Sequence, residues 1–309
     1  MGKEQIVVQL NPDVPPTGSD LGIVNAARKS FGMRSEWDYT DPINGKPVDP
    51  KDTSYEYLEV CSKSLKPKDK RLLEFLARGM TADDFEDFVE KVRDLSYDEL
   101  VSDYSSMRKE LVESLWQWRN TPTHDTPFNH GFFSFEVKAP IFVARHLVKH
   151  EYLIMSEYSR RYITEDVEFY VPDVWRKAAK DVKQGSSDEG IDFKGISNTG
   201  TPMMEVHANE RSYTETMEEY ICEESKNQFE VYKRLLLVGV APEQARMALP
   251  QSLMTSWTWS GTLGAFANTC KLRLSKDTQA ETRYVAEEVY EELKKQFPVA
   301  APLLVEGVY

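Results

Sequence analysis

The chain has 309 residues, of which 40% are hydrophobic, and it carries a formal net charge of −13. Its length allows a substantial buried core, whereas its charge argues against nonspecific binding to nucleic acid or to an anionic membrane, because both need clustered Lys and Arg. Its longest apolar runs fall far short of the about 20 residues that cross a bilayer, and its first residues show no signal-peptide pattern, so we expect a soluble cytoplasmic protein without nucleic-acid or membrane partners.

The first elements are predicted from a β-branched run and from a helix-capping residue. Residues 6–10 predict an edge strand. Ser19 is a plausible N-cap for a helix that brings Arg28 and Ser30 to its C-terminal end. Residues 37–66 are rich in Asp, Pro, Gly and Lys, which predicts a long surface loop.

The middle of the chain predicts helices and then a strand. Residues 68–78 have the spacing of a helix, and residues 81–118 have that of two acidic amphipathic helices. Residues 132–137 alternate like a strand, and Pro140 suits a first helical turn, so a helix is predicted from there to about His150. The buried stripe of the first helix is predicted to contain Leu72, Leu73, Phe75 and Leu76.

The last third of the chain predicts an irregular excursion followed by helices. Residues 182–209 mix Gly, Ser, Asn and Asp, which is typical of a mobile loop. Ser212 and Glu215 have capping-box spacing and predict the start of a long helix that ends near Gly239. Three more helices are predicted at residues 242–250, 261–272 and 276–296.

The three cysteines give no sign of a cross-link or a metal site. Cys61, Cys222 and Cys270 are far apart in the chain and have no CxxC spacing. We expect buried free thiols and no bound metal.

Four basic residues stand at the end of the helix predicted from Pro140. Arg145, His146, Lys149 and His150 repeat at i, i+1, i+4 and i+5, which would place them on one helical face. Four groups of like charge would repel one another there. Either an anion sits against this face, or solvent and nearby carboxylates screen it.

The segment that follows, residues 156–162 with the sequence SEYSRRY, gathers hydroxyls, a carboxylate and two guanidinium groups in one turn. These groups suit a phosphate together with the edge of a sugar or base. An ordinary N-capping turn is the alternative interpretation.

Residues 139–162, APIFVARHLVKHEYLIMSEYSRRY, resemble the signature block of the flavin-dependent thymidylate synthases. In that family the strand runs into an Arg-His-Arg helix and then into an Asn-Glu-x-Ser-x-Arg-Tyr turn. Four further segments resemble the family in the same order, at residues 19–31, 124–135, 243–250 and 268–281.

The resemblance implies an α+β fold with a central, mostly antiparallel sheet flanked by long helices. It further implies one domain over residues 1–309, with insertions at about residues 80–121 and 177–211.

The resemblance also implies roles for individual residues. Arg273 and His130 would be catalytic. The flavin would be bound by Ser30, His130, Lys149, His150, Glu157, Thr262 and Asn268. The nucleotide would be bound by His146, Lys149, Glu157, Tyr158, Ser159, Arg160, Arg161, Arg246 and Arg273. Without the resemblance, a core role for His130 and surface or helix-capping roles for Arg246 and Arg273 would be the default interpretations.

The activity implied by the resemblance is that of a methyltransferase that carries FAD. NADPH would reduce the FAD, and a one-carbon unit would pass from methylenetetrahydrofolate to C5 of dUMP, giving dTMP. Ser159, Arg160 and Arg161 would hold the phosphate, and Arg273 would stabilise negative charge on the uracil. The family also implies a homotetramer with active sites between subunits, in a bacterial cytosol or in the cytosol of a virus-infected host cell.

The chain departs from the family pattern at several positions. Lys149, His150 and Glu151 stand where the family has Arg-His-Arg, and Ser156 replaces an Asn. Losing one Arg contact to an anion, worth roughly 1.5 to 3 kcal/mol, would weaken flavin binding about ten- to a hundredfold. Further along the chain, Thr262, which is a predicted flavin contact, stands where the family usually has Asn. Gly264 stands where the family usually has Arg or Ser.

Two alternatives to thymidylate synthesis therefore stay open. The same scaffold could hydroxymethylate dUMP, or could methylate or hydroxymethylate dCMP. The chain could also be a catalytically silent nucleotide-binding protein or scaffold, with the acidic helices at residues 81–118 as a partner surface.

Overall fold

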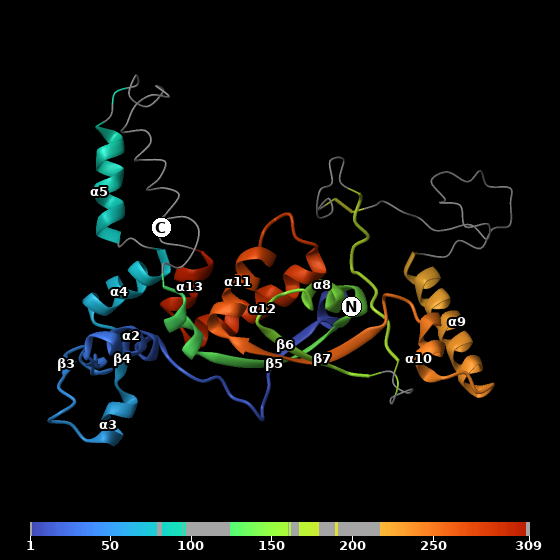
Figure 1. The fold of residues 1–309 in the computed structure, drawn as a ribbon, viewed down its shortest axis with the longest axis horizontal. Helices are drawn as coiled ribbons and strands as arrows, with labels where there is room; N and C mark the ends of the chain where they lie inside the picture. The colour runs from blue at the N-terminus through green and yellow to red at the C-terminus, as the bar shows by residue number, and fades with distance from the viewer. Residues whose placement is uncertain are drawn as a thin grey trace. The chain divides into compact units, whose positions relative to one another are not determined.

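A computed structural model describes residues 2–78, 82–94, 96, 124–159, 161, 167–178, 189–190 and 217–306 (Figure 1). The described chain combines helices with sheet, as the resemblance predicted, and it contains a second, small sheet that was not predicted. It divides into two compact units, each made of three segments. Unit 1 comprises Met1–Val14, Ser134–Ser260 and Leu272–Val289, and unit 2 comprises Pro15–Phe133, Gly261–Lys271 and Tyr290–Tyr309.

A four-stranded sheet has the strand order β1-β5-β7-β6. Strand β1 (Val7–Leu10) lies at one edge and pairs antiparallel with β5 (Phe132–Pro140), with Val7 opposite Lys138. The predicted edge strand and the strand predicted at residues 132–137 are therefore both confirmed. The other edge of the sheet is β6 (Leu153–Glu157).

The second central strand, β7 (Met254–Thr262), was not predicted, and residues 261–262 were wrongly assigned to a helix. Its burial alternates residue by residue, and Trp257 and Trp259 are each only 1% exposed. Such alternation is the pattern of a strand with one buried face. Helix α11 (Leu263–Arg273) starts directly after the strand.

Helix α8 (Ile141–Leu147) ends three residues earlier than predicted. Lys149 and His150 therefore lie in the turn after the helix, and the four basic residues do not share one helical face as expected. Tyr152, in the same turn, has a φ of 62°, which is uncommon for a residue with a side chain.

The signature segment at residues 156–162 was predicted as a turn, but it begins inside a strand. Ser156 and Glu157 are the last two residues of β6, and Tyr158 follows the strand. Residues 160 and 162–166 lie outside the described part of the chain.

Helices of different lengths complete unit 1. The predicted long helix is α9 (Met217–Leu237), and Gly239 just beyond it has a φ of 87°. Its predicted capping box at Ser212 lies outside the described residues. Helix α10 (Pro242–Ala245) continues into the 3-10 turn η3 (Arg246–Ala248), and α12 (Ala280–Gln296) begins in unit 1. The short helix α1 (Gly2–Gln5) precedes β1.

Unit 2 begins with α2 (Asp20–Arg28) and the 3-10 turn η1 (Lys29–Phe31). Ser19 caps α2 as predicted, because its Oγ accepts a hydrogen bond from the Gly22 amide at 3.1 Å. The helix predicted at residues 68–78 is α4 (Pro67–Arg78). In its predicted buried stripe, Leu73 and Leu76 are buried, whereas Phe75 is 41% exposed.

The segment at residues 37–66 was predicted as a loop but contains secondary structure. It holds a three-stranded sheet in the order β3-β2-β4, made of β2 (Asp38–Thr40), β3 (Pro47–Val48) and β4 (Ser62–Ser64). Helix α3 (Tyr55–Val60) precedes the last of these strands. Strands of two or three residues are too short to show an alternating pattern, which is why the sequence did not predict them.

The remaining elements of unit 2 are helical. Helix α5 (Ala82–Arg93) matches the first of the two acidic helices predicted at residues 81–118, and the second lies outside the described residues, as does most of residues 182–209. The 3-10 turn η2 (Thr126–His130) precedes β5, and α13 (Ala300–Val305) follows α12.

Cys61 and Cys270 are buried free thiols as expected, while Cys222 is partly exposed. None of the helices described is both long and apolar enough for a membrane span.

Candidate functional site

A cavity of about 590 Å³ in unit 1 collects four of the residues predicted to bind the nucleotide. Glu157 and Tyr158 from the end of β6, Ser159 beyond it and Arg246 from η3 all line this cavity. They come from segments nearly 90 residues apart in the chain. The fold therefore brings the signature segment and the segment at residues 243–250 to one cavity.

The cavity also contains residues that the sequence did not single out as ligands. Arg145 of α8 adds a second guanidinium group to that of Arg246. Thr255 of β7 donates a hydrogen bond from Oγ1 to Oε1 of Glu157 at 2.9 Å. Gln251 lies on the same lining, just before β7. Thr255 was overlooked because β7 was not recognised, whereas Arg145 was seen only as part of a charge cluster.

This lining combines two cations with one oriented carboxylate and several hydroxyl groups. Guanidinium groups suit a phosphate, because they donate charge-assisted hydrogen bonds to its oxygens. A carboxylate can accept hydrogen bonds from a sugar hydroxyl or from an N–H of a base. The cavity is thus equipped for a small phosphorylated ligand with a polar ring. Arg161 is exposed two residues after Ser159, and Arg160 lies outside the described residues.

A second group of predicted residues forms a basic cluster, which consists of His146, Lys149, His150 and Arg273. None of these four is part of the cavity lining in the described chain. Arg273, at the end of α11, donates a hydrogen bond from Nε to Nε2 of His150 at 2.8 Å. The Nδ1 atom of His146 lies 2.9 Å from Oγ1 of Thr282, which is fully buried in the first turn of α12. In Figure 1, α8 and α12 lie on the same side of the four-stranded sheet.

The basic cluster keeps its two histidines neutral. Burial, followed by the charges of Arg273 and His146, lowers the pKa of His150 to about 4. Burial, Arg273 and Lys149 also lower the pKa of His146. At neutral pH the positive charge of this cluster therefore resides on Lys149 and Arg273.

Two of the residues predicted to bind the flavin, Ser30 and His130, line one cavity of about 780 Å³ in unit 2. Its apolar lining includes Phe31, Leu72 and Phe75. The partial exposure of Phe75, which contradicts the predicted helix stripe, follows from its place in this cavity wall. Two other predicted flavin residues, Lys149 and His150, belong to the basic cluster of unit 1.

His124, Thr126 and the cations Arg28, Lys68 and Arg71 also line the cavity that contains Ser30 and His130, and the sequence did not single them out as ligands. His124 and Thr126 stand in the segment at residues 124–135 that carried the resemblance. Position in that segment was the one signal that could have pointed to them.

Thr262 and Asn268 are placed by the start of α11. Oγ1 of Thr262 donates to Oδ1 of Asn129 at 2.7 Å and accepts a hydrogen bond from the amide of Ala265 at 3.3 Å. A Cβ atom on Gly264 would lie 2.6 Å from Oδ1 of Asn129, which is closer than real Cβ atoms approach. The glycine thus makes room for Asn129, the neighbour of His130. Asn268 is exposed on the same helix.

The comparison with protein families supports the resemblance on which these expectations rest. The family model described as "thymidylate synthase complementing protein" matches residues 64–299. The flavin-dependent thymidylate synthase of Thermus thermophilus is 34% identical over 190 residues, which are 62% of this chain and 61% of that protein. The enzyme of the same name from Kosmotoga olearia is 32% identical over 189 residues, which cover 60% of this chain and 73% of that protein.

Solved structures show the same fold. The UMP/dUMP methylase PolB from Streptomyces cacaoi, bound with 5-Br UMP, superposes with a TM-score of 0.56 at 21% identity, covering 98% of this chain and 95% of that one. A second structure of this methylase, bound with 5-Br dUMP, gives a TM-score of 0.52 at 23% identity. Because the family model matches most of the chain, the chain belongs to the family of flavin-dependent thymidylate synthases.

Proposed function

We propose that this protein is a flavin-dependent methyltransferase that converts dUMP to dTMP. The one-carbon unit comes from methylenetetrahydrofolate, and NADPH is the reductant. The observation that carries the proposal is the cavity in unit 1, where Glu157, Ser159, Arg145 and Arg246 offer ligands for a pyrimidine nucleotide. The names of the relatives support the reaction type.

In this proposal the nucleotide cavity fixes the phosphate and the sugar. Arg246 and Arg145 hold the phosphate, while Ser159 donates from its hydroxyl group. Thr255 keeps one oxygen of Glu157 occupied, so that the carboxylate has a fixed orientation toward the ligand. Such fixed side chains lower the entropic cost of holding the nucleotide in one pose.

Arg273 stabilises the charge that develops when C5 of the uracil becomes a nucleophile. A guanidinium group can donate to a carbonyl oxygen and to a deprotonated ring nitrogen at the same time. The bond between Nε of Arg273 and His150 restrains the plane of the guanidinium and does not involve its terminal nitrogens. Because Arg273 does not line the nucleotide cavity of its own chain, in this proposal it acts on the uracil bound by a neighbouring subunit. Lys149 adds a second positive charge beside it.

The residues of unit 2 fit an aromatic cofactor of the flavin class. The cavity of about 780 Å³ has an apolar lining that suits a flat ring system, with Ser30 and His130 as hydrogen-bonding groups. Lys68 and Arg71 on the same lining suit the phosphates of FAD, whereas Arg28 is already paired with Asp69. When bound, FAD supplies the reducing equivalents that turn the transferred carbon into a methyl group.

The active assembly in this proposal is a homotetramer with its active sites between subunits. Apolar side chains next to the basic cluster are exposed, including Val148 at 55%, Tyr152 at 85% and Leu272 at 55%. Exposed apolar side chains grouped around a polar site are typical of a surface that another chain covers. Sedimentation analysis of the purified protein tests the assembly, and a monomer at micromolar concentration would contradict it.

The deciding experiment measures tritium release from dUMP labelled at C5, with FAD, NADPH and methylenetetrahydrofolate supplied. Release is expected, because the proton on C5 must leave when a carbon is added there. Mass analysis should identify the product as dTMP. If the product is hydroxymethyl-dUMP instead, the enzyme transfers a hydroxymethyl group and not a methyl group.

Two results would replace the proposal. No release from dUMP, together with turnover of dCMP, would reassign the pyrimidine. Folded, colourless protein that binds dUMP but takes up no FAD would identify a silent nucleotide-binding protein.

A further inference from the structure

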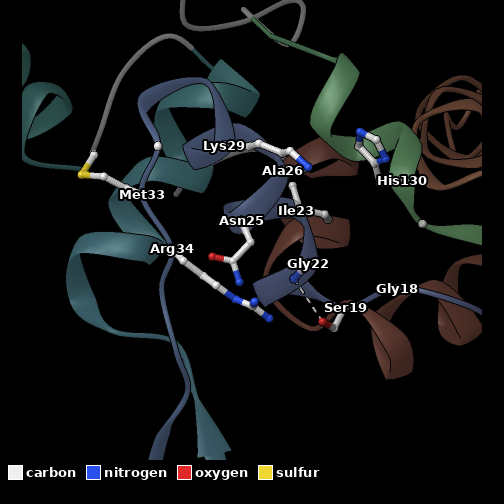
Figure 2. A pocket seen from close by; sticks show the side chains of 12 residues that line it. Gly18, Ser19, Gly22, Ile23, Asn25, Ala26, Lys29, Met33, Arg34 and His130 are labelled. Carbon is white, nitrogen blue, oxygen red and sulfur yellow. Dashed lines mark hydrogen bonds between the residues drawn. The ribbon is translucent and has the colours of Figure 1, made fainter.

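A second cavity of unit 2, about 530 Å³ in volume, has a basic lining (Figure 2). Lys29, Arg34 and His130 line it, and no Asp or Glu does so in the described part of the chain. The chain as a whole has 51 acidic and 38 basic residues, so an acid-free concave surface with three basic side chains runs against its overall charge.

The two permanent cations of this cavity are Lys29 and Arg34. Figure 2 shows the Lys29 side chain reaching toward His130, while Arg34 runs beneath Asn25 toward Gly22. Among the described residues, neither Lys29 nor Arg34 forms an ion pair, whereas the neighbouring Arg28 is paired with Asp69.

One acid stands on the first turn of α2, but it is engaged elsewhere. The buried carboxylate of Asp20 accepts hydrogen bonds from the amides of Val299 and Ala300, each at 2.9 Å. Its carboxylate is directed at these amides and does not line the cavity, so it does not contact Lys29 or Arg34 there.

Both ends of the segment that carries Lys29 and Arg34 are anchored. Before the segment, Arg28 donates from Nε to the fully buried Asp69 at 3.0 Å. After it, Ser35 donates to the other oxygen of Asp69, and its amide donates to Oδ1 of Asn25 at 2.7 Å. Anchoring on both sides reduces the conformational freedom that the two cations would lose on binding a ligand.

We propose that this cavity is an anion-binding site that takes a carboxylate or phosphate group of a small molecule. The cavity shares Ala26, Met33 and His130 with the larger cavity that contains Ser30. A ligand whose aromatic part lies against the flavin at this shared wall can therefore place its acidic end between Lys29 and Arg34.

The identity of that ligand rests on the proposed function. The acidic end belongs to a co-substrate of the flavin reaction, and it is either the glutamyl carboxylates of a folate or the phosphates of a nicotinamide dinucleotide. The anion-binding site itself does not depend on this assignment.

The experiment is a calorimetric titration of the full chain, at low and constant ionic strength, with two probes. Inorganic pyrophosphate stands for phosphate ligands, and a peptide of three glutamates stands for carboxylate ligands. The test variant is the double substitution Lys29→Ala/Arg34→Ala. The control variant Lys46→Ala/Lys51→Ala removes the same charge from two exposed lysines of unit 2 that do not line the cavity.

At least one probe should bind the natural chain, and the test variant should weaken that binding about tenfold or more, because charge-assisted hydrogen bonds are lost. The control variant should bind like the natural chain. The probe that binds identifies the source of the acidic group. If neither probe binds at millimolar concentration, or if both variants lose affinity equally, the site is refuted.

A third variant blocks the cavity without removing a cation. A Cβ atom at Gly22 would meet only Oγ of Ser19, at 3.5 Å, so a side chain fits there. Gly22→Glu places a carboxylate at the cavity and completes a capping box with Ser19, which favours α2. This variant should keep its melting temperature and lose anion binding, and retained binding in the folded variant would refute the site.

These titrations are independent of catalysis, so the two proposals can fail separately. A chain that binds the anion but releases no tritium from dUMP would refute the proposed reaction and retain the site. Tritium release from a chain that does not bind the anion would retain the proposed reaction and refute the site. In an active enzyme, Lys29→Ala/Arg34→Ala should raise the KM of one co-substrate and leave the affinity for dUMP unchanged, since dUMP is assigned to unit 1.

Discussion

Arg273 donates a hydrogen bond from Nε to Nε2 of His150, with 2.8 Å between the two nitrogens. The accepting nitrogen must carry a lone pair, so the bond assigns the ring proton of His150 to Nδ1. The pKa of His150 is lowered to about 4 by burial, Arg273 and His146, so the ring stays neutral and the bond persists at physiological pH. His150 is therefore a positioning residue for the guanidinium that we assign to the uracil.

Substitutions at these two residues should differ in size. Arg273→Ala removes the charge itself and should lower kcat about a hundredfold or more, as the loss of a transition-state donor does. His150→Ala keeps the charge but frees the guanidinium, so kcat should fall by about one order of magnitude. His150→Gln offers an acceptor oxygen and should recover part of that loss. Rates of tritium release give these values, and unchanged kcat in His150→Ala would remove the positioning role.

The lowered pKa of His150 predicts a pH dependence of stability. The unfolded chain takes up this proton near pH 6.5, whereas the folded chain resists it until about pH 4. Between these values the unfolded state binds more protons, so the free energy of unfolding should fall as pH drops from 6.5 toward 4. His146 acts in the same direction, since its pKa is also lowered. Urea denaturation at several pH values should therefore show a weaker pH dependence in His150→Gln, and equal dependences would contradict this.

Local signals were enough to predict many elements of this fold. Ser19 carries its own capping interaction, and the apolar spacing of α4 depends only on nearby residues, so both were predicted correctly. The end of α8 was not, because the helix stops at Leu147 without a glycine or proline to signal it. Strand β7 was overlooked although its tryptophans alternate with small polar residues.

The sequence predicted only those residues of the candidate site that belong to the motifs shared with the family. The resemblance grouped Glu157, Ser159 and Arg246, and the fold brings them to one cavity. No spacing in the sequence could reveal that Thr255 orients Glu157, or that Thr282 holds His146. Such partners come from distant strands and helices, and a contact between them leaves no local pattern.

The hydrogen bond between Thr255 and Glu157 predicts an indirect effect on nucleotide affinity. Thr255→Val removes the hydroxyl group but keeps the shape of the side chain, so Glu157 loses its fixed orientation. A loss of about 1 kcal/mol in the free energy of binding would weaken the affinity for dUMP roughly fivefold. Thr258→Val is the matched control, because Thr258 lies on the same strand and donates to Glu136, outside the cavity, at 2.7 Å. Equal losses of affinity in the two variants would exclude a specific role for Thr255.

The close approach of Asn129 to Gly264 predicts energetic coupling between the two residues. Gly264→Ala should displace the Asn129 side chain and break its hydrogen bond to Thr262. The loss of this bond should cost about 1 kcal/mol of stability, which offsets the stability gained from the higher helix propensity of Ala. In the background of Asn129→Ala the clash is absent, so Gly264→Ala should stabilise the protein. Urea denaturation of the four proteins of this cycle should give a coupling of about 1 kcal/mol. Additive effects would show that the methyl group is accommodated without moving Asn129.

The buried pair of Arg28 and Asp69 predicts a large loss of stability when one partner is removed. Asp69→Asn leaves the guanidinium of Arg28 without its counter-charge and should lower the free energy of unfolding by about 3 to 5 kcal/mol. Ser35→Ala removes only a hydroxyl group bonded to Asp69, so it should cost about 1 kcal/mol.

A double substitution of the same pair by apolar residues, Arg28→Met/Asp69→Leu, removes both charges together. It should be far less destabilising than Asp69→Asn, because no uncompensated charge is then left in the interior. Urea denaturation compares the variants, and a double variant as unstable as Asp69→Asn would mean that packing around Asp69, and not its charge, holds the segment that carries Ser30.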